Sequence, residues 1–92
     1  MSFFAPGAQI DHVVDRADGV VNLCEMKFYY SPFSISAAYE RELLRKRDIF
    51  VAETRTRKAA PLTLVCPQGV EPNAHRGAVQ EVIGAKDLFW RP

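Results

Sequence analysis

Two runs rich in β-branched residues, separated by a short polar turn, constrain the fold of this 92-residue chain more than any other feature. The runs cover residues 8–16 and 20–28, and Ala17-Asp18-Gly19 lies between them. Runs of this kind, joined by a glycine-containing loop of this length, are typical of a β-hairpin. The sequence therefore predicts two antiparallel strands in its first third.

The register of this hairpin decides which side chains share a face, because a slip of one residue moves every side chain to the opposite face. A three-residue loop places Asp11 opposite Glu25, whereas a two-residue Asp18-Gly19 turn makes Asp11 face away from Glu25. The three-residue loop is favoured because it matches apolar residues across the strands. Its expected pairs are Ile10 with Met26, Val13 with Leu23, and Gln9 with Lys27. Two opposed carboxylates repel each other at this spacing, so we expect a positive side chain between them.

The segment from Ser36 to Lys58 contains no glycine or proline and has helical periodicity. Tyr39, Leu43 and Phe50 fall on one face of the predicted helix. Ser36 is the expected N-cap, because its hydroxyl suits the free amides of a first turn. Basic residues suit the negative end of the helix dipole, and three are expected in the final turns: Arg55, Arg57 and Lys58.

A nearly continuous apolar run follows at residues 62–66 and predicts a strand that is covered on both faces. A last strand is expected within residues 78–83, and a helical turn within 85–89. The order β-β-α-β-(β) predicts an α/β fold in which the helix packs on a mixed sheet. We expect residues 1–92 to form a single domain, because a chain of this length does not supply two cores. Cys24 and Cys66 lie in apolar runs and are expected to be buried thiols.

Composition and charge narrow the functional classes. A hydrophobic content of 48% and a charged content of 25% are typical of a folded domain, and the net charge of +1 excludes a wholly electrostatic polyanion binder. No apolar stretch approaches the roughly 18 residues that cross a bilayer, and the first residues do not form a secretion signal. We therefore expect a cytoplasmic protein without a membrane partner.

The triplet Glu25-Met26-Lys27 follows Asp11 after thirteen intervening residues. This Asp followed by E-x-K resembles the PD-(D/E)xK nuclease superfamily, which has the restriction-endonuclease-like fold. The resemblance implies that Asp11 and Glu25 hold Mg²⁺ or Mn²⁺, that the Met26 carbonyl adds a ligand, and that Lys27 helps to activate water for DNA hydrolysis. Such an ion is commonly bound through one or two carboxylates together with waters and phosphate oxygens. The alternative is an inactive nuclease fold used for partner or DNA binding and assembly.

A narrower resemblance covers nearly the whole chain. The segments 7–11, 22–28, 56–58 and 87–89 are similar to the C-terminal portion of bacterial AAA-type ATP-binding proteins. The resemblance implies an N-terminal ATPase region as partner, while no P-loop motif, and hence no expected ATP site, occurs in this chain.

The superfamily pattern begins with a helix and a first strand, whereas only six residues precede Gly7. We therefore expect both elements to be absent and this chain to be inactive by itself. A missing first strand would leave an open edge on the hairpin or on residues 62–66. Because an open edge invites strand pairing between chains, we expect a homodimer or larger assembly.

Two groups of side chains near the E-x-K triplet each allow two interpretations. Helix residues Arg41, Arg45 and Lys46 are candidates for contact with a nucleic-acid backbone, or belong to a solvated face on which Glu42 pairs with Arg45 or Lys46. The aromatic residues after the triplet suit either stacking on bases or closing a core or partner interface, and the second is favoured. They are Phe28, Tyr29, Tyr30 and Phe33.

Overall fold

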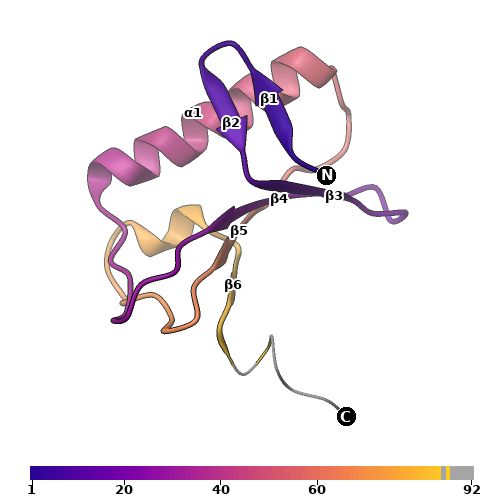
Figure 1. Cartoon of the computed structure of the whole chain (residues 1–92). Coiled ribbons are helices and arrows are strands. Elements are labelled where there is room, and N and C mark those ends of the chain that lie inside the picture. Colours follow the sequence, from indigo (N-terminus) through magenta and orange to yellow (C-terminus); the bar gives the residue numbers. More distant parts are fainter. Residues whose placement is uncertain (86, 88–92) are drawn as a thin grey trace.

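The computed structural model describes residues 1–85 and 87, which form short strands around one long helix (Figure 1). The elements, in chain order, are β1 (Phe3–Ala5), β2 (Ala8–Ile10), β3 (His12–Asp15), β4 (Val21–Met26), α1 (Ala37–Thr54), β5 (Leu62–Val65), the 3₁₀ helix η1 (Arg76–Ala78) and β6 (Glu81–Ile83). The helical turn expected in residues 85–89 lies largely outside the described residues. Within the described residues, no helix combines the length and the apolar character that a membrane crossing requires.

Four strands form a mixed sheet in the order β3-β4-β5-β6. β3 and β4 are antiparallel, whereas β4, β5 and β6 run parallel to one another. The connection from β4 to β5 passes through α1, which lies on one face of the sheet (Figure 1). The predicted α/β class, with a helix on a mixed sheet, is therefore confirmed.

The hairpin of β3 and β4 has the three-residue loop that the apolar matching favoured. Val13 pairs with Leu23, and Asp15 pairs with Val21. The amide of Arg16 donates to the Val20 carbonyl at 2.9 Å and closes the loop. Gly19 takes a φ of 83°, a left-handed conformation that glycine adopts without steric cost.

The first predicted strand is divided in two by a bend at Asp11. β2 pairs with β1 rather than with β4, so that Gln9 lies opposite Phe4 instead of Lys27. Ile10 likewise lies opposite Phe3 instead of Met26. The prediction of one continuous strand over residues 8–16 is therefore wrong, because the N-terminal residues supply a competing partner for β2.

The strand β1 also corrects the expectation that no strand precedes Gly7. Pro6 and Gly7 connect β1 to β2, and Gly7 has a φ of 83°. Proline followed by a glycine at positive φ is typical of a type II turn. The hairpin is held on α1 by Phe3, whose ring meets the Phe50 ring edge-to-face at 5.0 Å between centroids.

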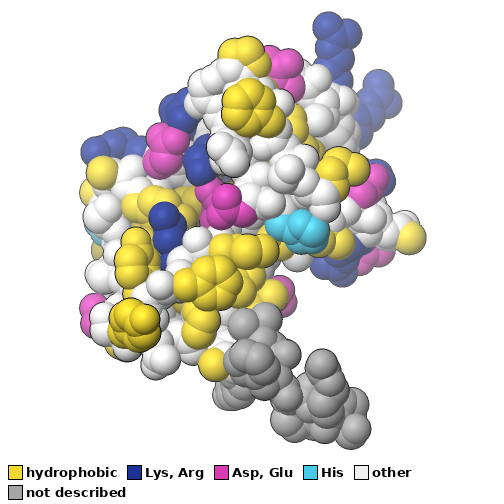
Figure 2. Space-filling view, in the orientation of Figure 1, with side chains coloured by type: hydrophobic (Ala, Val, Ile, Leu, Met, Phe, Trp, Pro, Cys, Tyr) yellow, Lys and Arg dark blue, Asp and Glu magenta, His cyan; other side chains and the backbone are white. Residues whose placement is uncertain are grey.

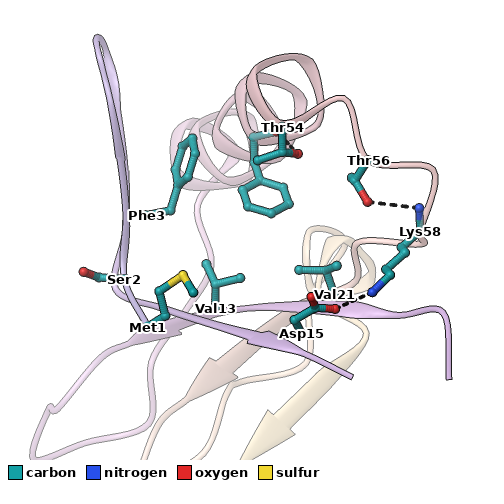
Figure 3. Close-up of a pocket in the computed structure, with 10 residues that line it drawn as sticks. Met1, Ser2, Phe3, Val13, Asp15, Val21, Thr54, Thr56 and Lys58 are labelled. Atoms are coloured by element: carbon teal, nitrogen blue, oxygen red, sulfur yellow. Dashed lines mark hydrogen bonds and ion pairs between the residues drawn. The ribbon is translucent and has the colours of Figure 1, made fainter. Parts of the chain in front are cut away.

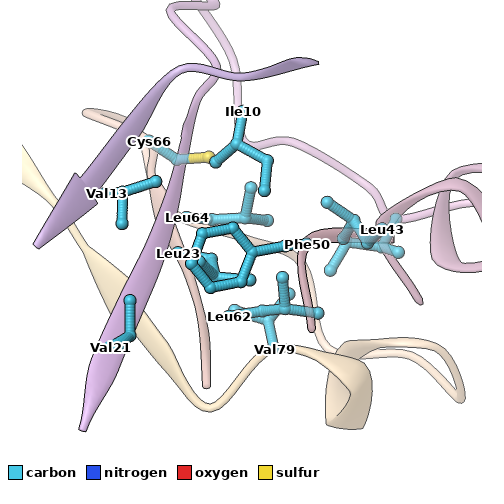
Figure 4. Close-up of a cluster of buried hydrophobic side chains, with 11 residues drawn as sticks. Ile10, Val13, Val21, Leu23, Leu43, Phe50, Leu62, Leu64, Cys66 and Val79 are labelled. Carbon is cyan, nitrogen blue, oxygen red and sulfur yellow. The ribbon is translucent and has the colours of Figure 1, made fainter. Parts of the chain in front are cut away.

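The hydrophobic core lies between α1 and the sheet (Figure 4). Leu43 and Phe50 are the buried helix residues, and Tyr39 packs partly buried beside them, as the predicted helix face requires. They meet buried sheet residues that include Leu23 and Leu64. All four residues of β5 are buried, as its apolar run predicts. Burial of each Leu or Phe side chain contributes about 1.5–3 kcal/mol, so this contact stabilises the whole fold.

The helix starts where the sequence predicts and ends earlier. Ser36 Oγ accepts a hydrogen bond from the Tyr39 amide at 3.0 Å, which confirms the predicted N-cap. The last helical residue is Thr54 rather than Lys58, because Arg55 takes a left-handed conformation with a φ of 54°. The basic residues expected in the final turns therefore lie beyond the helix. From there the chain returns to the sheet, where the Val21 amide donates to the Ala59 carbonyl at 2.8 Å.

Two further expectations concern sheet edges and cysteines. β5 lies between β4 and β6, so residues 62–66 do not form an edge, which corrects one basis for the expected assembly. Self-association itself stays a prediction.

Cys24 and Cys66 are both free and buried, as expected, and burial raises the pKa of each thiol.

Candidate functional site

Asp11 and Glu25 lie together where the bend after β2 meets the end of β4. The Asp11 amide donates to Glu25 Oε2 at 2.9 Å, and the Met26 amide donates to Asp11 Oδ2 at 3.1 Å. The bend explains the first bond, because it takes the Asp11 amide out of the strand ladder and leaves it for a side-chain acceptor. The register that was favoured from the sequence therefore brings the two carboxylates to one place.

The Glu25 side chain is buried, with only 4% of the residue exposed. A buried carboxylate is strongly destabilising unless it is paired and hydrogen-bonded. Lys46, from the middle of α1, supplies the partner through a hydrogen bond from its ammonium to Glu25 Oε1. A positive side chain was expected between the two carboxylates, and Lys46 supplies one at Glu25. Lys46 is thus engaged inside the fold and is not an open contact for a nucleic-acid backbone.

Lys27 follows β4 and lies over aromatic rings. Its ammonium is 4.8 Å from the centroid of the Tyr39 ring and 5.9 Å from that of Phe33. Such cation–π contacts restrict a lysine without neutralising its charge. Among the described residues, Lys27 forms no ion pair with Asp11 or Glu25. The structure therefore brings Asp11, Glu25 and the Met26 amide together and sets Lys27 to the aromatic side of them.

Tyr39 is a site residue that the sequence indicated only as part of the core. Its hydroxyl is buried and has no hydrogen-bond partner among the described residues. Burial raises the pKa of Tyr39, and the negative charge of Glu25 raises it further. A buried hydroxyl without a hydrogen-bond partner destabilises the folded state by about 1–3 kcal/mol. Helical periodicity predicts that the ring is buried but not that the hydroxyl lacks a hydrogen-bond partner.

Of the three basic residues proposed for nucleic-acid contact, Arg41 and Arg45 line one surface depression on α1, whereas Lys46 pairs with Glu25. Arg45 Nη1 donates to the Gly7 carbonyl at 2.6 Å, and Arg45 also pairs with Glu42. The hydrogen bond between the Arg45 and Glu42 side chains lowers the pKa of Glu42 and raises the pKa of Arg45. The predicted alternative, a Glu42 to Arg45 pair on a solvated face, is therefore present. Arg41 is exposed and, within residues 1–85 and 87, has no ion pair.

The donor set at this place fits a hard divalent cation. Asp11 is exposed, and its Oδ1 accepts no hydrogen bond from the described residues. Magnesium commonly takes one or two carboxylates and completes its shell with waters or phosphate oxygens. Within the described part of the chain, no group of three or more His, Cys, Asp or Glu side chains is placed to hold a metal. Asp11 and Glu25 are the two carboxylates here that could contribute to a cation site, and both oxygens of Glu25 already accept hydrogen bonds, from the Asp11 amide and from Lys46.

A separate pocket of about 340 Å³ lies between β1, β3 and the end of α1 (Figure 3). Its walls are mostly apolar and include Phe3, Val13 and Phe50, while Asp15 and Lys58 form an ion pair at 2.6 Å beside it. None of the proposed catalytic or metal-binding residues lines this pocket. The carboxylate pair is thus not part of this pocket.

Exposed hydrophobic side chains gather next to the candidate site. Figure 2 shows them over the loop between β4 and α1, with acidic and basic side chains beside them. Three consecutive aromatic residues, Phe28, Tyr29 and Tyr30, account for much of this exposure. They directly follow the E-x-K triplet. The site therefore combines carboxylates, a lysine and exposed aromatic rings within one short stretch of sequence.

Comparisons with models of protein families, with curated proteins and with solved structures gave no match to this chain. Any function assigned to it therefore rests on the fold and on the carboxylate pair.

Proposed function

We propose that this chain is a PD-(D/E)xK nuclease-like module, with a restriction-endonuclease-like fold, that hydrolyses DNA phosphodiester bonds with Mg²⁺ or Mn²⁺. The observation that carries the proposal is the hydrogen-bonded pair of Asp11 and Glu25 beside Lys27. The mixed sheet, with a helical crossover directly after the E-x-K strand, supports the same fold.

Each site residue has a role in this proposal. Asp11 and Glu25 would hold the cation, and the backbone carbonyl of Met26 would add a ligand. The bound ion supplies a Lewis acid for the phosphate and favours ionisation of water. Lys27 orients the attacking water, and its position over Tyr39 limits the conformations of its ammonium. The burial of Glu25 would strengthen its attraction for a cation, because charges interact more strongly where water is excluded.

The basic residues and the ATPase partner take secondary places. Of the three helix residues, Arg41 is the one that is open to a DNA backbone. Lys46 is paired with Glu25, and Arg45 contacts the Gly7 carbonyl and Glu42. In the longer protein, the N-terminal AAA-type ATPase region is the proposed partner.

A second function is favoured by the contacts of Glu25. Both of its oxygens are hydrogen-bonded within the fold, to the Asp11 amide and to Lys46. A polar cluster that only fixes the fold makes the same contacts. The second candidate is therefore a non-catalytic nuclease-like domain that binds a partner or DNA and serves assembly.

Titration with Mn²⁺, followed by the loss of the electron paramagnetic resonance signal of the free ion, tests the first proposal. Cation binding is the more direct readout, because it does not depend on the choice of DNA substrate. We expect one site in the wild type, no site in Asp11→Asn, and an unchanged site in Asp18→Asn, whose carboxylate lies in the hairpin turn and pairs with Arg16. Equal binding by all three proteins would contradict the assignment.

A plasmid-nicking assay separates the two candidate functions. Nicking by the wild type in Mn²⁺ that is lost in Glu25→Gln favours catalysis. Specific Mn²⁺ binding without nicking favours the binding and assembly role for this chain.

A further inference from the structure

Three aromatic rings form a column from the surface to the core. The rings of Tyr29 and Phe33 are stacked, with centroids 5.3 Å apart and planes within 5° of parallel. The ring of Phe33 then meets Tyr39 edge-to-face, again at 5.3 Å. The centroid of the Tyr39 ring lies 4.8 Å from the ammonium of Lys27, the last residue of the E-x-K triplet. The column therefore connects the exposed loop to the candidate site.

The outer end of this column is exposed. Tyr29 is 51% exposed, Phe28 is 65% exposed, and Tyr30 is fully accessible. Of the four aromatic residues after the triplet, only Phe33 packs against the core. The favoured interpretation, closure of a core or a partner interface, is therefore wrong as to the core for the other three residues, and a partner interface stays a prediction. Neighbouring exposed aromatic residues, unlike isolated ones, mark an interaction surface.

The backbone holds the column in place. The Phe33 amide donates to the Gly69 carbonyl, and the Glu71 amide donates to the Phe33 carbonyl, each at 2.9 Å. Phe33 is thereby fixed to the loop after β5, and the stacked ring of Tyr29 rests on a fixed neighbour. A ligand that stacks on Tyr29 meets a ring that is already positioned, which lowers the entropic cost of binding.

A positive charge accompanies the rings. The Lys27 ammonium lies within 6 Å of the ring centroids of both Phe33 and Tyr39. Exposed aromatic rings with a cation beside them are the combination by which proteins bind single-stranded nucleic acids: bases stack on the rings, and phosphates meet the charge. A duplex offers its phosphates but not the faces of its bases, and an apolar protein partner makes no use of the charge.

We propose that Phe28, Tyr29 and Tyr30 form a stacking platform for unpaired bases, so that the nucleic acid bound at this site is single-stranded. This inference rests on the proposed function for the cleavage step and specifies its substrate. Tyr29 stacks on Phe33, and the Lys27 ammonium lies 5.9 Å from the centroid of that same Phe33 ring, so we expect the phosphates of a strand stacked on Tyr29 to approach Lys27. From Lys27 the chain needs only two residues to reach Glu25, a span of at most about 7 Å.

The test is fluorescence anisotropy of labelled oligonucleotides in EDTA, where neither metal binding nor cutting contributes. Three probes of equal length are compared: oligo(dT), an abasic strand with the same number of phosphates, and a blunt duplex. We expect oligo(dT) to bind about fivefold or more tightly than the abasic strand, because each stacked base adds favourable free energy. Binding of the duplex should be no tighter than that of the abasic strand.

Substitutions at the platform should remove this preference. Tyr30→Ala and Tyr29→Leu are each expected to weaken oligo(dT) binding about 5- to 150-fold and to leave abasic binding unchanged. Phe4→Ala is the matched control, because Phe4 is 80% exposed and lies on the β1–β2 hairpin. Circular dichroism checks that each variant is folded.

Equal binding of oligo(dT) and abasic strands, or an equal loss in Phe4→Ala, overturns the inference. So does self-association that disappears in Tyr30→Ala without any base-dependent binding, since the platform then belongs to a second copy of the chain. The two proposals fail separately. Base-dependent binding without a Mn²⁺ site leaves this inference intact, whereas a Mn²⁺ site without base preference removes this inference alone.

Discussion

The Asp11 amide donates a hydrogen bond to the Glu25 carboxylate, and the amide of Met26, the residue after Glu25, donates one to the Asp11 carboxylate. Two carboxylates are thereby held together at the end of β4, where their mutual repulsion needs an opposing charge. Lys46 provides that charge at Glu25. The contribution of the Lys46–Glu25 pair to the free energy of unfolding is measurable, and so is the effect of a divalent cation on it.

Lys46→Met should destabilise the fold, because it keeps most of the side-chain stem and leaves the buried Glu25 carboxylate without its charge partner. Breaking a buried pair costs about 3–5 kcal/mol, and the partial exposure of Lys46 reduces the expected loss to about 2–3 kcal/mol. Lys58→Met is the matched control, since its pair with Asp15 is exposed and should contribute less than about 1 kcal/mol. Urea denaturation measures both changes. If a divalent cation binds at Glu25, millimolar Ca²⁺ restores more stability to Lys46→Met than to the wild type, and equal effects of Ca²⁺ would count against the site.

Glu25→Gln should lower the free energy of unfolding by about 1–3 kcal/mol. Two donors, the Asp11 amide and the Lys46 ammonium, approach the two oxygens of Glu25, whereas glutamine has one acceptor oxygen and would place its own donor against one of them. Glu42→Gln alters an exposed pair with Arg45 and should change stability by less than about 0.5 kcal/mol. Equal stability of the two variants in urea would show that the buried contacts of Glu25 contribute nothing.

Tyr39→Phe should stabilise the protein by about 1 kcal/mol, because it removes a buried hydroxyl that has no partner among the described residues. Tyr30→Phe, at a fully accessible position, should have no effect. A fall in stability for Tyr39→Phe in urea would mean that the hydroxyl makes a favourable interaction in solution.

The same variant tests the raised pKa of Tyr39, which follows first from burial and then from the charge of Glu25. Above pH ~10 the unfolded chain ionises this tyrosine before the folded protein does. The free energy of unfolding of the wild type should therefore decrease as the pH rises from the unfolded-state pKa of this tyrosine toward its folded-state pKa. Tyr39→Phe should lose less over the same range, and parallel pH curves for the two proteins would contradict the expected shift.

Gly7→Ala should weaken the β1–β2 hairpin. Gly7 has a φ of 83°, where a Cβ atom adds about 1 kcal/mol of strain. Gly77→Ala is the control, because Gly77 has no positive φ and its added Cβ meets nothing within 4 Å. Hydrogen exchange should show faster exchange of hairpin amides in Gly7→Ala only, and unchanged exchange would mean that the turn does not hold β1 in place.

Local sequence patterns predicted those elements that depend on residues close together in the chain. Apolar matching across the strands predicted the hairpin register and thus the meeting of Asp11 with Glu25. The hydroxyl of Ser36 predicted the start of α1, and the apolar run at residues 62–66 predicted a strand buried along its whole length. Each of these features depends on a few residues close together in the chain.

Features that depend on tertiary packing could not be predicted in this way. The turn at Pro6-Gly7 carried a recognisable signal, but the contact of Phe3 with Phe50 that holds its hairpin on α1 joins distant segments. The need for a positive charge beside Glu25 was predictable, whereas the choice of Lys46 depends on how α1 rotates against the sheet. The unpartnered hydroxyl of Tyr39 is likewise a consequence of packing.

An NMR titration of the isotope-labelled chain with Mn²⁺ tests the central claim most directly, because paramagnetic broadening locates the bound ion. If Asp11 and Glu25 hold a cation, substoichiometric Mn²⁺ selectively broadens the amides of Asp11 and of residues 25–27, and Asp11→Asn abolishes the effect while Asp18→Asn preserves it. Uniform weak broadening, or broadening that persists in Asp11→Asn, would contradict the metal site and with it the proposed nuclease function.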